Sequence, residues 1–169
     1  MHFKPIVAFL VGALAMQPLT AAAAEVMLLE TFKDWSAFKH ESDAETVCFA
    51  TTRPKDVAPK VEGATEAYLY LSYYPKEGIR SEVSLKLSYP AKKGSSISVS
   101  IGSDVFRFNP KKDRAFLDNL DAEKKFLDAL RKGEKLVVKG TPAKGDETIE
   151  VYSLIGVSDA MKKAEAACL

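Results

Sequence analysis

The middle of the chain alternates apolar and polar residues, which predicts β-strands. Residues 82–89 alternate without error, and one face of this segment carries only large apolar side chains: Val83, Leu85, Leu87 and Tyr89. A period of two is typical of an antiparallel strand with one face buried and the other in water. Apolar residues then alternate with serines over 97–101 as far as Gly102-Ser103. This Gly-Ser pair favours a tight hairpin with a return strand at 104–108, stopped by Asn109-Pro110.

Further strands are predicted on both sides of this region. Residues 47–51 and the aromatic-rich segment 67–74 are expected to be strands, separated by a loop over 55–66. Residues 135–141 and 147–154 predict a last hairpin. The pattern between residue 25 and the strand at 47 indicates no definite element.

Two short helices are expected near the C-terminal end. Apolar residues recur at four-residue steps from Ala122 to Leu130, which makes one apolar stripe on a helix. Asp121 can cap the start of this helix, and Gly133 can end it. A second helix is expected over 160–167, with Ser158-Asp159 at its start.

Together these elements predict a mainly β fold of the β-rich α+β type. Strands outnumber helices, and their hairpin linkage implies an antiparallel β-sandwich or a partly closed barrel with two short packed helices. No Gly/Ser-rich or Pro-rich linker divides the chain. Residues 25–169 are therefore expected to form a single domain.

Residues 1–24 are predicted to be a cleaved secretory signal peptide. A short basic start is followed by an uncharged apolar run from Ile6 to Met16, and then by Ala22-Ala23-Ala24 before Glu25. The apolar run has about half of the ~20 residues that a spanning helix needs, which argues against a retained transmembrane anchor. We expect the mature protein in the periplasm, with secretion or attachment to the outer surface as the alternatives.

The charge balance disfavours one class of partner. The full chain holds 24 basic and 23 acidic residues, and loss of Lys4 with the signal leaves the mature chain neutral. Nucleic-acid binders need an excess of Lys and Arg to displace counterions from phosphates, so no nucleic-acid partner is expected. Residues 76–144 still carry 16 basic and 9 acidic residues. This segment is either a solvated surface balanced by acidic flanks or a basic face for lipid head groups or acidic glycans.

Cys48 and Cys168 are the only cysteines of the chain. An even number of cysteines in a chain bound for an oxidising compartment predicts one disulfide. It would tie the chain end to an early strand. Two free buried thiols are the alternative, and a metal site is disfavoured because no His or Cys lies at ligand spacing from either cysteine.

The mature sequence carries no motif of an enzyme or of a cofactor site. His40 is its single histidine, and no Gly-x-Ser-x-Gly elbow or phosphate-cradling glycine loop occurs. Acidic residues cluster between Asp113 and Glu123 without the ligand spacing and central glycine of an EF-hand loop. We therefore expect no catalytic residue, cofactor or metal. Carboxylates brought together by folding remain an alternative.

Tyrosines mark the one candidate binding face. If Tyr73 fills the core together with Leu69 and Leu71, alternation turns the other tyrosines of this strand outward: Tyr68, Tyr70 and Tyr74. Tyr offers a large contact area at low entropy cost, so this face is a candidate surface for a protein or a glycan. The alternative is that a helix or the N-terminal segment covers it. Trp35 is expected to fill the core.

Seven short segments of the mature chain, taken in their order, resemble a known family pattern. They are Lys33-Asp34-Trp35-Ser36, Val47-Cys48-Phe49-Ala50, Arg53-Pro54, residues 82–90, Ala129-Leu130-Arg131-Lys132-Gly133, Lys139-Gly140-Thr141, and Tyr152-Ser153-Leu154-Ile155-Gly156 leading to Cys168. This ordered set resembles the invasion-associated locus B family of exported Gram-negative bacterial proteins. The stretch 145–150 is more acidic than the pattern of that family.

The resemblance implies a small periplasmic or surface-associated β domain with no established enzyme activity. Some members of the family are linked to the invasion of host cells. We therefore expect a non-enzymatic binding or envelope-associated protein, with an unknown protein or envelope component as its partner. A carboxylate-dependent hydrolase of cell-envelope or glycan substrates and a periplasmic chaperone are the alternatives.

The predicted signal peptide can be tested directly. N-terminal sequencing of the protein exported by a Gram-negative host is expected to read Glu25-Val26-Met27, because cleavage follows the small residue at position 24. A sequence that starts at Met1 would contradict the prediction.

Overall fold

The structure, a computed structural model, describes residues 25–169. The predicted signal peptide at 1–24 lies outside the described residues. The described chain holds these elements: β1 Glu25–Phe32, β2 Trp35–Glu41, β3 Thr46–Thr52, β4 Asp56–Ala58, β5 Tyr68–Tyr74, β6 Ile79–Lys86, β7 Ile97–Ile101, β8 Asp104–Lys111, β9 Arg114–Phe116, α1 Leu120–Lys132, β10 Lys135–Gly140, β11 Thr148–Ser153 and α2 Val157–Cys168.

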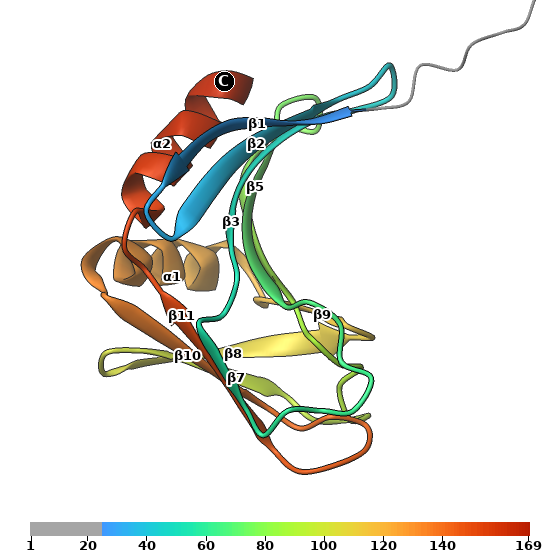
Figure 1. Ribbon diagram of the computed structural model, residues 1–169. Helices are drawn as coiled ribbons and strands as arrows, with labels where there is room; N and C mark the ends of the chain where they lie inside the picture. The colour runs from blue at the N-terminus through green and yellow to red at the C-terminus, as the bar shows by residue number, and fades with distance from the viewer. Residues whose placement is uncertain (1–24) are drawn as a thin grey trace, which may run out of the picture.

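The strands form one antiparallel sheet in the order β1-β2-β3-β5-β6-β9-β8-β7-β10-β11-β4. The sheet does not close, because β1 and β4 stand at its two ends. In Figure 1 the strands β3 and β5 bow, and both helices lie on the convex side. The expected mainly antiparallel β fold with two helices is confirmed, in a sandwich-like form.

The N-terminal segment, for which the sequence indicated no definite element, is a hairpin. β1 and β2 pair along their length with one irregularity, and the chain turns at Lys33-Asp34, where Lys33 has a φ of 55°. Trp35 starts β2 and is fully buried, and its indole Nε1 donates a hydrogen bond to the carbonyl of Ser153 at 3.0 Å. The expected core position of Trp35 is therefore confirmed.

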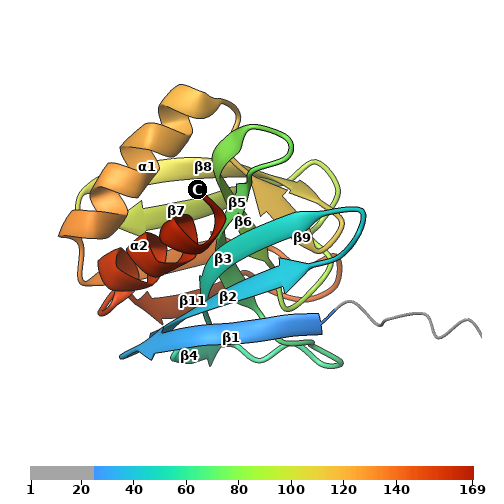
Figure 2. The same ribbon diagram turned by 90° about the horizontal axis from the view of Figure 1, so that it is seen from above.

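Helix α2 covers the inner face of β2, β3 and β5, as Figure 2 shows from above. It starts after Gly156, which has a φ of 97°. A Cβ at this position would lie 1.9 Å from the carbonyl oxygen of Phe32. Only glycine combines this close approach with this left-handed backbone, so Gly156 lets the helix start directly against β1.

Several predicted boundaries are wrong. The N-cap of α1 is Asn119, whose side chain accepts a hydrogen bond from the amide of Ala122, and not Asp121. Helix α2 begins at Val157 with no side-chain cap, earlier than the expected Ser158-Asp159 start. β8 runs through Asn109-Pro110 to Lys111, because a proline is tolerated where its missing N–H is not needed for pairing. The predicted end of α1 at Gly133 is confirmed.

Cys48 of β3 and Cys168 of α2 form the predicted disulfide, with their Cα atoms 5.8 Å apart and 120 positions between them. Cys48 is fully buried beneath the helix. The bond therefore fastens the last residue of α2 to β3, the third strand from the β1 end of the sheet.

Removal of this disulfide is expected to destabilise the fold strongly. In the chain-entropy model a long closed loop restricts the unfolded chain, and loss of a native disulfide costs about 2–5 kcal/mol. The double variant Cys48→Ala/Cys168→Ala should unfold at a lower urea concentration than the wild type. A reductant should shift the wild type toward the variant and leave the variant unchanged. Equal midpoints under oxidising conditions would contradict the prediction.

A buried carboxyl group lies at the centre of β11. Glu150 is fully buried and accepts hydrogen bonds from the hydroxyls of Ser88 at 3.0 Å and Tyr152 at 2.8 Å. Burial raises the pKa of Glu150 above its usual 4.5, although both hydrogen bonds oppose this. The neighbouring Thr148 and Tyr89 hydroxyls bond to each other at 2.6 Å. The fold therefore holds a proton on Glu150 more tightly than the unfolded chain does.

This difference predicts a stability that falls as the pH rises. The carboxyl contributes fully below about pH 4.5, and its contribution is lost as the pH climbs through the raised native pKa. Glu150→Gln copies the protonated group, so the variant should gain free energy of unfolding relative to the wild type near pH 7.5 and lose this advantage near pH 4. Glu147→Gln, at an exposed neighbouring acid, is the control. Parallel pH profiles for wild type and Glu150→Gln would refute the proposal.

Candidate functional site

A shallow groove of about 530 Å³ lies on the face of β1, β2, β3 and β5 that is opposite to α2. The strands alternate side chains between two faces. On the inner face, Leu69, Leu71 and Tyr73 are buried, and burial together with the Glu165 carboxylate of α2 raises the pKa of Tyr73 to about 12. The alternate residues of the same strands therefore point away from the helix and form the groove.

Four aromatic rings make up the floor of this groove, and we call them the aromatic row. They come from three neighbouring strands and are Phe38, Phe49, Tyr70 and Tyr68. Ring centres lie 5.3 Å apart between Phe38 and Phe49, 5.7 Å between Phe49 and Tyr70, and 5.5 Å between Tyr70 and Tyr68. All four side chains are part exposed. The groove thus presents a continuous aromatic surface to solvent.

Basic side chains lie at the edges of the aromatic row. The guanidinium carbon of Arg53 is 5.1 Å from the centre of the Tyr68 ring, and that of Arg114 is 5.8 Å from the centre of the Tyr70 ring. Both distances suit cation–π contact. Glu66 accepts a hydrogen bond from Tyr68 and forms an ion pair with Arg53 at 2.7 Å. Among residues 25–169, Arg114 has no acidic partner within ion-pair distance.

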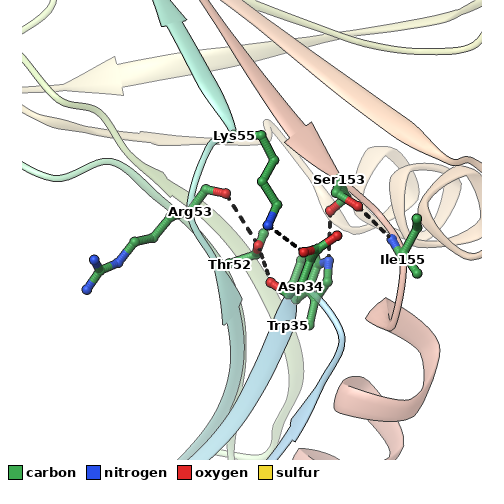
Figure 3. A network of polar contacts seen from close by, with 7 residues as sticks. All are labelled: Asp34, Trp35, Thr52, Arg53, Lys55, Ser153 and Ile155. Carbon is green, nitrogen blue, oxygen red and sulfur yellow. Dashed lines mark hydrogen bonds and ion pairs between the residues drawn. The ribbon is translucent and has the colours of Figure 1, made fainter.

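A polar network fixes one end of the groove, as Figure 3 shows. Asp34, in the turn between β1 and β2, forms an ion pair with Lys55, and its backbone carbonyl accepts a hydrogen bond from the Thr52 hydroxyl at 2.6 Å. Its amide donates to the carbonyl of Ile155 at 3.3 Å. Hydrogen bonds from Lys55 and then Ser153 lower the pKa of the Asp34 carboxyl. Asp34 is therefore ionised at neutral pH and links β2, β3 and β11.

The three predicted tyrosines do not form one site. Tyr68 and Tyr70 lie in the groove, and burial raises the pKa of Tyr70. Tyr74 lies past an irregularity of the β5–β6 pairing, with its hydroxyl 3.4 Å from Glu82, and does not line the groove. Both helices lie on the other side of these strands, so neither covers Tyr68 and Tyr70.

Sequence reasoning missed the other half of the aromatic row. Phe38 and Phe49 face each other as a cross-strand pair of β2 and β3. The signal was available as alternation, because Ser36, Phe38 and His40 alternate with Trp35, Ala37 and Lys39. The charged residues in this segment concealed that period.

Other candidate chemistry lies elsewhere. No set of three or more His, Cys, Asp or Glu side chains within residues 25–169 is placed to hold a metal ion. His40 lies 3.9 Å from Glu45, outside the groove. Of the acidic cluster between Asp113 and Glu123, Glu123 lies in the first turn of α1 and accepts a hydrogen bond from the amide of Val83, and burial raises its pKa. Neither of the two described helices is of a length and apolarity that would cross a membrane.

Comparisons of the chain with protein-family models, with curated proteins and with solved structures gave no match. The groove and its residues are therefore the basis for a functional proposal.

Proposed function

We propose that this protein acts outside the cytoplasm, in the bacterial envelope, as a non-enzymatic binding protein whose ligand occupies the groove over the aromatic row. The observation that carries the proposal is the aromatic row itself, four part-exposed rings in contact across β2, β3 and β5. Exposed aromatic rings with convergent polar groups are typical of binding sites. The predicted signal peptide and the disulfide support an extracytoplasmic location.

The groove chemistry favours binding over hydrolysis. A general acid needs a carboxyl that keeps its proton near neutral pH. The groove is lined by one carboxylate, Asp34, and its pKa is lowered by Lys55. The carboxyls with raised pKa values, Glu123 and Glu150, lie outside the groove and are occupied by hydrogen bonds. These positions give the alternative of a carboxylate-dependent hydrolase no support.

The resemblance to the invasion-associated locus B family agrees with this proposal. It implies an exported β protein without catalytic residues. It assigns no ligand, so the groove residues must be tested by themselves.

A photo-crosslinker placed in the groove tests the proposal. A benzophenone side chain at Tyr70 should, on irradiation of intact cells, give discrete adducts of higher mass, because the ligand contacts this ring. The matched control carries the benzophenone at Val105, which is 69% exposed on β8 and lies outside the groove. Adducts from Tyr70 alone would support the proposal. The same adducts from both positions, or none from Tyr70, would rule out the groove as a binding site.

A further inference from the structure

We propose that the ligand of the groove is an acidic glycan, a chain of sugar rings that bear carboxylate groups. This inference rests on the proposed binding function and adds the chemical class of the ligand. It follows from three features of the groove: the course of the aromatic row, the basic groups at its edges, and the complete hydrogen-bond pairing of the central strand beneath it.

The aromatic row crosses from β2 through β3 to β5 and then continues along β5 from Tyr70 to Tyr68. Phe38 pairs with Phe49 between β2 and β3, and Thr51 pairs with Tyr70 between β3 and β5. Neighbouring strands are about 4.8 Å apart, so successive rings repeat at the 5.3–5.7 Å spacing of their centres. The tilt between neighbouring rings varies, from 17° between Phe38 and Phe49 to 63° between Phe49 and Tyr70. A row of differently tilted rings suits a flexible polymer whose successive rings each contact one aromatic side chain. The apolar faces of sugar rings meet this requirement.

Basic side chains at the edges of the aromatic row favour an anionic ligand. Stacking on Tyr68 and Tyr70 orients the guanidinium groups of Arg53 and Arg114 beside the rings. Arg presents planar paired donors that match a carboxylate, and the stacked position reduces the entropy lost on binding. Lys33 and Lys55 also line the groove. Arg53 is paired with Glu66 and Lys55 with Asp34, so the basic groups at the groove that have no acidic partner among residues 25–169 are Lys33 and Arg114.

The backbone beneath the row disfavours an extended peptide. An added peptide strand binds through free backbone groups at the edge of a sheet. The floor of the groove is the face of β2, β3 and β5, and β3 is paired on both of its sides. A ligand on this face must bind through side chains. Stacked rings and charged groups are the side-chain chemistry that the groove offers.

Single-stranded nucleic acid is the competing polymer, because bases also stack on aromatic rings in basic grooves. The charge of the protein speaks against it. The described residues 25–169 hold equal numbers of basic and acidic side chains, without the excess that a polyphosphate needs. Because an acidic glycan also carries about one charge on each ring, the direct comparison with a nucleic acid below decides between the two polymers.

Titration calorimetry of the purified mature chain with hexagalacturonate tests the inference. Maltohexaose is the neutral sugar control, and a single-stranded deoxythymidine decamer is the nucleic-acid control. Hexagalacturonate is expected to bind at least about tenfold more tightly than either control, because only it offers both rings and carboxylates. Raising the salt should weaken this binding, since part of the attraction is between charges.

Variants locate the binding in the groove. Arg114→Gln should weaken hexagalacturonate binding about tenfold, and Tyr70→Leu about fivefold. The matched controls are Arg107→Gln, at an exposed arginine of β8, and Tyr74→Leu, at the tyrosine of β5 outside the groove. Both controls should stay within about twofold of the wild type. If Tyr70→Leu does not fold, as judged by thermal unfolding, the exposed Arg114 carries the test.

Equal binding of neutral and acidic sugars, tighter binding of the deoxythymidine decamer, or no binding of hexagalacturonate would overturn the acidic-glycan inference. Equal loss in the Arg114 and Arg107 variants would also overturn it. The proposed binding function fails separately, when the benzophenone at Tyr70 gives no specific adduct. Specific adducts without sugar binding would leave a groove that binds a ligand of another class.

Discussion

The packing of α2 against the inner face of β2, β3 and β5 is the constraint on which the groove depends. The disulfide fixes this packing by joining Cys168 of the helix to Cys48 of β3. A strand alternates its side chains with a period of two, so a shift by one residue would exchange its two faces. Once Cys48 and Ala50 are held beneath the helix, Phe49 must point to the other side. The bond that closes the core therefore also determines which rings reach solvent.

Two carboxyl groups show how the same fold gives opposite protonation behaviour. Asp34 lies at the surface end of the groove, where Lys55 lowers its pKa and keeps it charged. Glu150 is fully buried, and its hydrogen bonds from Ser88 and Tyr152 do not cancel the cost of burying the charge. Asp34 thus stabilises a turn through an ion pair, while Glu150 is a polar element of the core that makes stability depend on pH.

The sequence predicted the strands with one wholly apolar face, although the alternating segment 82–89 overlaps β6, Ile79–Lys86, only in part. Alternation located β7 and the Gly102-Ser103 turn. The disulfide partners followed from an even number of cysteines in a chain predicted to reach an oxidising compartment. Prediction from the sequence failed where contacts between distant segments determine the structure. β1 carries the apolar run Val26-Met27-Leu28-Leu29 and yet is mostly exposed, and charged residues in β2 concealed its alternation. The start of α2 depends on Gly156 meeting Phe32, residues 124 positions apart in the chain. The sequence predicted only two of the four rings of the aromatic row for the same reason. Tyr68 and Tyr70 belong to one segment, whereas Phe38 and Phe49 are brought beside them by pairing between strands.

The position of the groove on strands, and not on loops, has a consequence for binding. Each ring of the aromatic row projects from a strand with paired backbone, and Asp34, Thr52 and Lys55 anchor one end of the groove. A ligand would therefore meet side chains that are already held near their bound positions, and little backbone entropy would be lost. Arg114, which stacks on Tyr70 and has no acidic partner within ion-pair distance among residues 25–169, adds positive charge at the edge of a row whose centre is uncharged. Affinity would then come from ring stacking along the row, while discrimination between charged and neutral ligands would come from its edges.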